Sequence, residues 1–143
     1  MKIRIKRLDR TLPLPQYKTK SAAGFDVYAR TTTVIKPKEI SYIPLNVVLE
    51  IPSGTWVMLA PRSSTHKLGI TAANSIGVGD ADFCGDNDEY HFAAFNFTDK
   101  EVIIERGTRI AQMILINYDQ VQFEEVESFD RESRGGFGST GLK

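Results

Sequence analysis

Hydrophobic and polar residues alternate over several short stretches of the chain, which is the pattern of β-strands with one face turned to a core. The first stretch sets Ile3 and Ile5 between basic residues. The other stretches are rich in β-branched and aromatic residues and are bounded by proline, glycine, aspartate or asparagine. Strands are predicted at 2–7, 40–51, 55–60, 90–97, 101–105, 109–117 and 121–126.

Only one short helix is predicted, at residues 63–69. Ser63 or Ser64 can cap its start, and Gly69 can end it in the left-handed conformation. No long window of the sequence carries the amphipathic period of a helix. The pattern therefore predicts an all-β sandwich or barrel.

The same patterns predict the domain organisation. Strand-forming stretches fill residues 1–126, which we expect to form one β domain. Residues 127–143 contain many glycines and few side chains suited to a core, and they are expected to form a flexible C-terminal arm.

The charge balance excludes a bulk electrostatic attraction to nucleic acid or to an anionic membrane, because 18 basic residues are matched by 18 acidic ones. An anionic ligand must therefore be held by a local cluster of donors. Cys84 is the single cysteine, which excludes an intrachain disulfide and fits a reducing compartment. No signal peptide or membrane-spanning stretch is visible, so we expect a soluble cytoplasmic protein.

Two polar clusters in the first half of the chain are candidate ligand sites. Residues 23–26 (AGFD) place an acid after a tight turn, and an ordinary turn closed by the aspartate explains them equally well. Residues 61–64 (PRSS) combine a guanidinium, two hydroxyls and the start of the predicted helix, which together suit an anion. A plain helix cap beside a surface arginine is the alternative.

Two further clusters are richer in glycine. Residues 74–85 (NSIGVGDADFCG) have the glycine spacing of a hairpin that approaches a flat ligand, and they carry Asp80, Asp82 and an aromatic ring. A solvated acidic turn is the alternative here. Residues 134–141 (RGGFGSTG) combine phosphate-type donors with one phenylalanine that can stack on a base. A disordered tail does not account for that aromatic residue.

Taken together, the clusters resemble the five ordered motifs of the trimeric dUTPase family. The matching segments are AGFDVYA (23–29), PRSSTHKLGI (61–70), NSIGVGDADFCG (74–85), RGTRIAQMIL (106–115) and RGGFGSTG (134–141). The resemblance implies a jelly-roll protomer of the dUTPase-like β-clip type, assembled as a homotrimer with sites shared between subunits. It implies hydrolysis of dUTP to dUMP and pyrophosphate, with Mg²⁺ bound mainly through the triphosphate and the arm closing over the site.

The resemblance also implies roles for single residues. Asp80 corresponds to the acid that activates the attacking water, and Phe83 stands where a tyrosine usually packs under the deoxyribose. Asp26 corresponds to an acid that supports the water shell of the metal or pairs with an arginine. The remaining residues implied in substrate binding are Arg62, Ser63, Ser64, Asn74, Gly77, Gln112, Arg134, Phe137, Gly138, Ser139 and Thr140.

Besides Phe83, two departures from the family pattern stand out. Gly79 occupies a position that usually holds a branched apolar residue, and the stretch after Gly85 is about three residues longer than the commonest version. A longer hairpin tip or a bulge explains the extra residues. Alternatively, Asp86, Asp88 or Glu89 alters the site through a metal contact.

Two other functions remain open from the sequence. The dCTP deaminases, including bifunctional deaminase-dUTPases, share the fold and the Arg-Ser-Ser motif, and Glu89 lies near the position of their catalytic glutamate but at a different spacing. A regulatory protein built on the dUTPase fold is the non-enzymatic alternative. It would be expected to have lost Asp80 or the arm, and both are present.

Overall fold

A computed structural model describes residues 1–136 and consists almost entirely of β-strands joined by turns. The strands are β1 (Arg4–Arg7), β2 (Phe25–Tyr28), β3 (Thr33–Ile35), β4 (Ile40–Pro44), β5 (Val47–Glu50), β6 (Thr55–Pro61), β7 (Ile70–Ala72), β8 (Gly77–Gly79), β9 (His91–Asn96), β10 (Val102–Ile104) and β11 (Arg109–Asn117). One short 3₁₀ helix, η1 (Thr65–Leu68), lies between β6 and β7. The predicted all-β class is confirmed.

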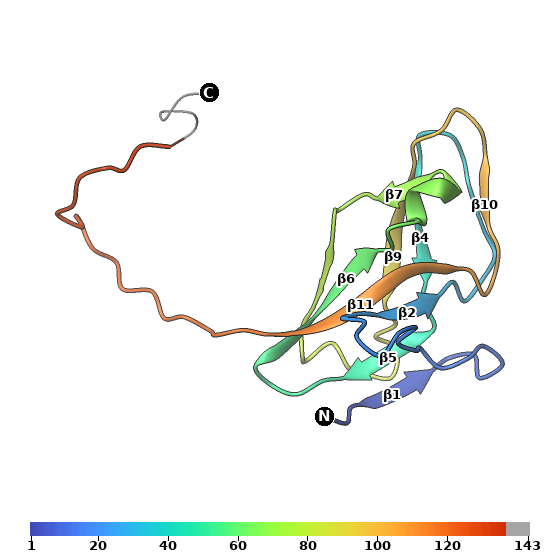
Figure 1. Cartoon of the computed structure of the whole chain (residues 1–143), viewed down its shortest axis with the longest axis horizontal. Coiled ribbons are helices and arrows are strands. Elements are labelled where there is room, and N and C mark those ends of the chain that lie inside the picture. Colours follow the sequence, from blue (N-terminus) through green and yellow to red (C-terminus); the bar gives the residue numbers. More distant parts are fainter. Residues whose placement is uncertain (137–143) are drawn as a thin grey trace.

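The strands form two larger sheets and two strand pairs, all antiparallel. One sheet has the order β2-β11-β6-β8 and the other β4-β9-β7, while β1 pairs with β5 and β10 with β3. Figure 1 shows these strands gathered in a single β body. Apolar side chains from all of these sheets meet in one core, whose fully buried members include Ile35, Ile43, Ile70, Ile110 and Met113.

Two sequence predictions near the site agree closely with the structure. β11 covers the predicted residues 109–117, and β6 extends the predicted 55–60 by one residue. The predicted helix is present as a single 3₁₀ turn, and Gly69 ends it in the left-handed conformation with φ +81°. The expected cap differs, because the Ser64 side chain makes no hydrogen bond to the helix start.

The predicted strand 40–51 is divided in the structure into β4 and β5. Asn46 adopts a left-handed conformation with φ +68°, which breaks the extended backbone between them. The buried Asn46 side chain accepts a hydrogen bond from the Asp9 backbone N–H (2.6 Å) and donates one to the Asp9 carbonyl (2.9 Å). Asparagine tolerates this conformation better than most residues, and the two hydrogen bonds to Asp9 hold its side chain in place.

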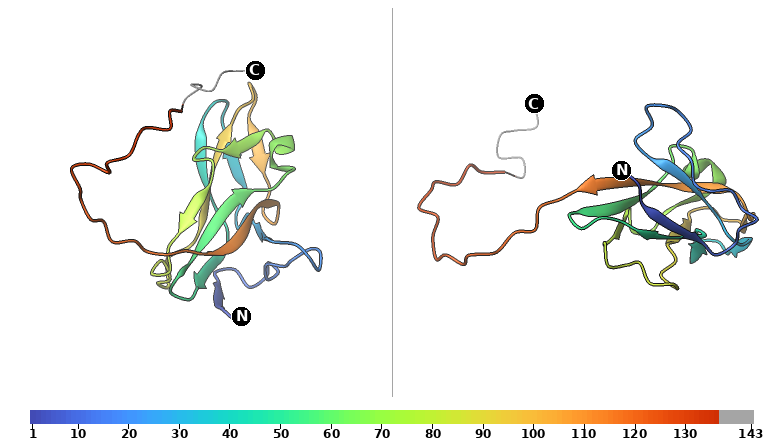
Figure 2. Two further views of the ribbon diagram at one scale, coloured as in Figure 1. Left: turned by 60° about the vertical axis from the view of Figure 1, so that its left-hand side comes forward. Right: turned by 90° about the horizontal axis from the view of Figure 1, so that it is seen from below.

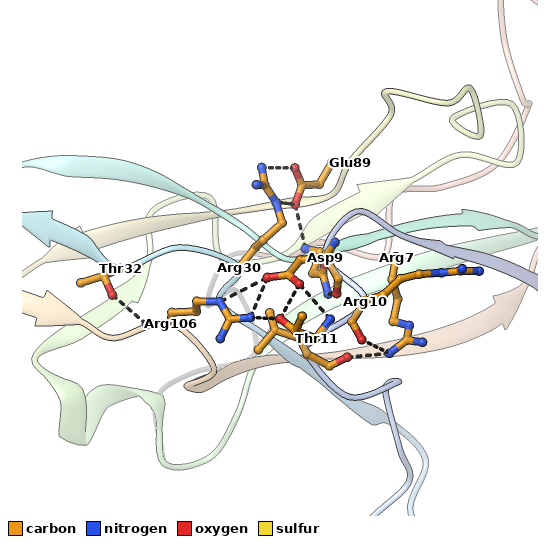
Figure 3. Close-up of polar contacts among 10 residues, drawn as sticks. Arg7, Asp9, Arg10, Thr11, Arg30, Thr32, Glu89 and Arg106 are labelled. Carbon is orange, nitrogen blue, oxygen red and sulfur yellow. Dashed lines mark hydrogen bonds and ion pairs between the residues drawn. The ribbon is translucent and has the colours of Figure 1, made fainter.

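Salt bridges connect segments that are distant in the sequence. The Arg106 guanidinium donates to the Asp9 carboxylate (2.6 Å), and Asp9 also accepts from the Thr11 hydroxyl (2.6 Å), as Figure 3 shows. The Thr11 hydroxyl and the Arg106 guanidinium hold the pKa of the Asp9 carboxyl well below its usual range. These contacts tie the loop after β1 to the loop before β11.

The predicted strand 121–126 is wrong. The described chain beyond β11 contains no strand, and Figures 1 and 2 show it running away from the β body. Phe123 is 94% exposed and Val121 is 67% exposed. An alternating sequence forms a strand only where another strand pairs with it. No strand of this protomer pairs with the described residues 118–136.

Candidate active site

The register of the four-stranded sheet gathers the predicted phosphate-binding residues. Gln112 on the central strand β11 pairs with Asp26 on β2 and with Ala60 on β6. Directly paired residues point to the same face of a sheet, and so do residues two apart on one strand. Arg62 follows directly on the end of β6, and its hydrogen bond to Asp26 shows that its side chain lies on the same side as Asp26.

Asp26 is the centre of this cluster. Its buried carboxylate accepts from Arg62 Nε (3.0 Å) with one oxygen and from Arg109 Nη1 (2.9 Å) with the other. Arg62 Nη1 also donates to the Arg109 carbonyl (3.0 Å). The structure thus gives Asp26 two arginine partners. Two guanidinium groups against one carboxylate leave a net positive charge, which is the local charge that a protein of zero net charge needs to hold an anion.

The turn after β6 is held in place by a threonine. The Thr65 hydroxyl accepts from the Arg62 N–H (2.8 Å) and donates to the Ile110 carbonyl (2.7 Å). Ser63 is exposed and Ser64 is half-buried, and neither hydroxyl has a protein partner within residues 1–136. Both hydroxyls are therefore free to donate to a ligand beside the arginines.

The Gln112 amide lies at the edge of the same cluster. Its Nε2 donates to the Pro61 carbonyl (3.2 Å), which joins β11 to the end of β6. A Cβ added at Gly24 would lie 3.0 Å from Gln112 Oε1 and 3.2 Å from the Met113 carbonyl. Glycine at position 24 therefore allows the chain before β2 to approach β11 closely.

The predicted water-activating acid lies in a separate cleft of about 300 Å³. Asp80 is exposed and follows directly on β8, which pairs with β6 through Gly77 and Gly79. The chain turns there, since the Phe83 N–H donates to the Asp80 carbonyl (3.2 Å). The cleft is lined by Tyr42, Leu59, Gly77, Val78, Gly79, Asp80, Phe83, Glu89, Tyr90 and His91.

Tyr90 explains why position 79 is a glycine. A Cβ at Gly79 would lie 2.4 Å from Tyr90 Oη and 2.5 Å from Tyr90 Cε1. The Tyr90 ring also packs edge-to-face against Phe83, with centroids 5.2 Å apart and an interplanar angle of 81°. The ring of Tyr90 thus fills the space that a branched side chain at position 79 would need.

This contact leads to a prediction about stability. We expect Gly79→Ala to lower the free energy of unfolding by about 1–3 kcal/mol, because the added methyl forces Tyr90 out of its packed position. In Gly79→Ala/Tyr90→Leu the clash is relieved, so the double variant should be more stable than the sum of the single effects predicts, by about 1 kcal/mol. Urea denaturation of the four proteins measures this coupling. Additive effects would show that the two residues do not share this space.

The acids of the longer stretch after Gly85 all have structural partners. Asp86 accepts from Lys6 Nζ (2.8 Å), and Asp88 accepts from the Gly85 N–H (2.7 Å). Glu89 is buried and is bound by Arg30, as Figure 3 shows. These contacts favour the explanation that the extra residues form a variant hairpin tip. Within residues 1–136, no group of three or more histidine, cysteine, aspartate or glutamate side chains is arranged to hold a metal ion.

The single chain does not bring all the predicted residues into one place. Gly79 is paired with Val57 on β6, whereas Arg62 lies five positions further along, roughly 16 Å at the rise of a β-strand. The Asp80 cleft accordingly contains none of the side chains of Arg62, Ser63, Ser64 and Gln112. Asn74 is exposed in the turn before β8.

Of the arm residues predicted to bind the substrate, only Arg134 lies in the described part of the chain, and it does not line the Asp80 cleft. Arg134 is exposed on the segment that leaves the β body in Figures 1 and 2. The other arm residues assigned to the substrate lie outside the described residues: Phe137, Gly138, Ser139 and Thr140.

Arg109 and Tyr90 also belong to these clusters, and neither is among the site residues predicted from the sequence. Arg109 lies three positions before Gln112 in the fourth motif, and its position in a β-bulge, where the register with β2 shifts, brings it to Asp26. A sequence pattern gives no sign of such a bulge. The hydrophobic pattern predicts Tyr90 only as part of a strand, and the unusual glycine at position 79 is the one sign in the sequence that a large side chain packs nearby.

No helix in the described part of the chain is long and apolar enough to cross a membrane. The fold and the two clusters define the chain as an all-β protein of the jelly-roll type, with a cluster of arginine and hydroxyl side chains and an acid-bearing cleft on its loops. More particularly, the sequence model of the dUTPase family matches residues 10–141, and the chain belongs to that family.

Known proteins resemble the chain over its whole length. The deoxyuridine 5'-triphosphate nucleotidohydrolase of Hydrogenobaculum sp. (strain Y04AAS1) is 38% identical over 147 aligned positions, with all of both chains covered. A variant of the Staphylococcus bacteriophage 80alpha dUTPase, solved with dUpNHpp, superposes with a TM-score of 0.85 at 23% identity and 99% coverage of both chains. A variant dUTPase from phage phi11 of S. aureus, solved to show the coordination of a structural Mg(II) ion, gives 0.81 at 19% identity, with 92% of this chain and all of that chain covered.

Proposed function

We propose that the protein is a cytoplasmic dUTP pyrophosphatase, which hydrolyses dUTP to dUMP and pyrophosphate by attack of water on the α-phosphate. This activity would keep uracil out of DNA and supply dUMP for thymidylate synthesis. One observation carries the proposal. This member of the dUTPase family has both an exposed carboxylate beside an aromatic ring and, separately, a cluster of net positive charge.

In the proposed mechanism, Asp80 accepts a proton from the attacking water or orients it. Such general-base assistance contributes typically ~10²–10⁴-fold to a rate. Arg62, Ser63, Ser64 and Gln112 hold the triphosphate, and their donors stabilise the charge that develops as the α-phosphate is attacked. Asp26 orients Arg62 and Arg109, to which it is bound.

The acids present fit a metal that is held mainly by the substrate. Mg²⁺ is usually bound in proteins by one or two carboxylates together with substrate phosphates, and Asp26 is the acid among the phosphate-binding residues. Mg²⁺ bound through the triphosphate supplies additional neutralising charge. Asp26, whose oxygens accept from Arg62 and Arg109, contributes at most through a water molecule.

Recognition of the nucleoside is assigned to the Asp80 cleft. The Phe83 ring packs under the deoxyribose and leaves no room for a ribose 2′-hydroxyl. Asn74 and the backbone at Gly77 contact the edge of the uracil. The exposed position of Asn74 and the open cleft beside Phe83 support this assignment.

Complete sites require more than one subunit. We propose a homotrimer, in which the Asp80 cleft of one protomer faces the Arg62 cluster of another and the arm of residues 127–143 closes over the ligand. The distance of roughly 16 Å along β6 between these two clusters supports such sharing. The exposed Val121 and Phe123, on a segment that leaves its own β body, also support it.

The experiment that tests the function is a pyrophosphate-release assay with dUTP, dCTP, dTTP and UTP in the presence of Mg²⁺. We expect turnover of dUTP and at least about 100-fold lower kcat/KM for dCTP, because a site built around hydrogen bonds to uracil rejects a base that leaves those bonds unmade. UTP and dTTP keep the hydrogen-bonding edge of uracil, and they should be turned over more slowly because the cleft has no room for the ribose 2′-hydroxyl or for the C5 methyl group. Equal rates with dCTP, or no release from dUTP, would contradict the proposal.

The structure disfavours the deaminase alternative. Glu89, the acid nearest in sequence to the catalytic glutamate of dCTP deaminases, is buried and accepts three hydrogen bonds from Arg30 and from the Asn46 N–H. A carboxylate held in this way is not positioned to transfer protons to a substrate. Measuring ammonia release from dCTP in the same assay decides between the two activities.

A further inference from the structure

The Tyr90 hydroxyl differs from every other buried polar side-chain atom in the described residues. Within residues 1–136 it is the single buried side-chain nitrogen or oxygen without a hydrogen-bond partner, and Tyr90 as a whole is only 6% exposed. A buried polar group without a partner is unfavourable, and such groups in native structures are uncommon outside functional sites. A hydrogen-bond partner gained on substrate binding would therefore stabilise this hydroxyl.

The hydroxyl lies beside the proposed catalytic acid. Tyr90 Oη is the atom closest to the Cβ position of Gly79, the residue immediately before Asp80. Tyr90 and Asp80 both line the same cleft, together with Phe83, whose ring the Tyr90 ring supports edge-to-face. The Asp80 carboxylate and the Tyr90 hydroxyl therefore belong to one cleft, on residues that are adjacent to Gly79 in sequence and in space respectively.

The two groups have complementary hydrogen-bonding capacity. Burial, together with the negative charge of Asp80, raises the pKa of Tyr90 to about 12, so its hydroxyl stays protonated and can donate at neutral pH. The other acid and the histidine that line the cleft already have partners, since Glu89 binds Arg30 and His91 Nδ1 lies 2.8 Å from the Glu89 carbonyl. The Asp80 carboxylate has no hydrogen-bond partner for its side chain within residues 1–136.

We propose that Tyr90 is a positioning residue for the reaction: when substrate fills the cleft, the Tyr90 hydroxyl donates a hydrogen bond to the Asp80 carboxylate and orients it toward the attacking water. This inference rests on the proposed function and extends it to a residue that no motif includes. Glycine at position 79 is part of the arrangement, because any larger residue there would displace the Tyr90 hydroxyl.

Tyr90→Phe tests the proposal, since it removes the hydroxyl and keeps the ring packed against Phe83. We expect kcat for dUTP to fall about tenfold with KM changed less than about twofold, because the lost hydrogen bond acts on the reacting carboxylate rather than on substrate affinity. The thermal midpoint of unfolding should stay the same or rise, because an unpartnered buried hydroxyl has been removed. Tyr17→Phe, which removes a hydroxyl from an exposed tyrosine whose ring packs on Phe25, is the matched control and should leave both quantities unchanged.

The outcomes separate this inference from the function on which it rests. An active parent protein with an unchanged kcat in Tyr90→Phe would overturn the positioning role and leave the proposed function intact. A raised KM with an unchanged kcat would overturn it too, because the hydroxyl would then serve ground-state binding. A parent protein that releases no pyrophosphate from dUTP would overturn both.

Discussion

Asp80→Asn is expected to lower kcat for dUTP hydrolysis by ~10²–10⁴-fold, the usual contribution of a general base. The amide has nearly the same shape as the carboxylate, but it cannot accept the proton of the attacking water. Since Asp80 is exposed at the end of β8 and its side chain has no structural partner in the described chain, the substitution should leave the fold unchanged. Affinity for the non-hydrolysable analogue dUpNHpp should stay within a few-fold of the parent.

The measurement combines steady-state pyrophosphate release with calorimetric titration of dUpNHpp. Asp82→Asn is the matched control, because Asp82 is an exposed acid two positions away in the same turn and outside the residues that line the cleft. We expect Asp82→Asn to retain turnover close to that of the parent. If Asp80→Asn kept full turnover, Asp80 would lose its place as the water-activating group.

Glu89→Ala is expected to have the largest effect on stability, lowering the free energy of unfolding by about 3 kcal/mol. The Glu89 carboxylate is almost fully buried and receives two bonds from Arg30 (2.7 and 2.8 Å) and one from the Asn46 N–H (2.8 Å). Removing it leaves a guanidinium and a buried backbone N–H without partners. Arg30 retains 30% side-chain exposure, so water offsets part of the loss and the effect falls at the lower end for a buried pair.

Urea denaturation of the parent and variant measures this effect. Glu50→Ala is the matched control, since it removes an acid that pairs with Arg4 at the surface, and exposed ion pairs contribute little to stability. A loss in Glu89→Ala no larger than that in Glu50→Ala would contradict the structural role assigned to the longer stretch after Gly85.

The strand pattern and the motifs were readable from the sequence because they depend on neighbouring residues. Period-two alternation and the flanking turn residues located β6 and β11, and a glycine at position 69 located the end of the 3₁₀ helix. Very short strands such as β3 and β8 carry three residues each, too few for an alternating pattern to stand out. The break at Asn46 depends on contacts with Asp9, which is far away in the sequence.

The sequence by itself determined the all-β class, the resemblance to the dUTPase family and the residues whose side chains are suited to catalysis or phosphate binding, Asp80 among them. These follow from residue types and from spacing along the chain. Tertiary structure alone decided which of those residues meet: Asp26 with Arg62 and Arg109, and Tyr90 with Gly79. Such meetings depend on strand register, on a bulge and on the volume of side chains many residues apart, and local sequence contains none of this information.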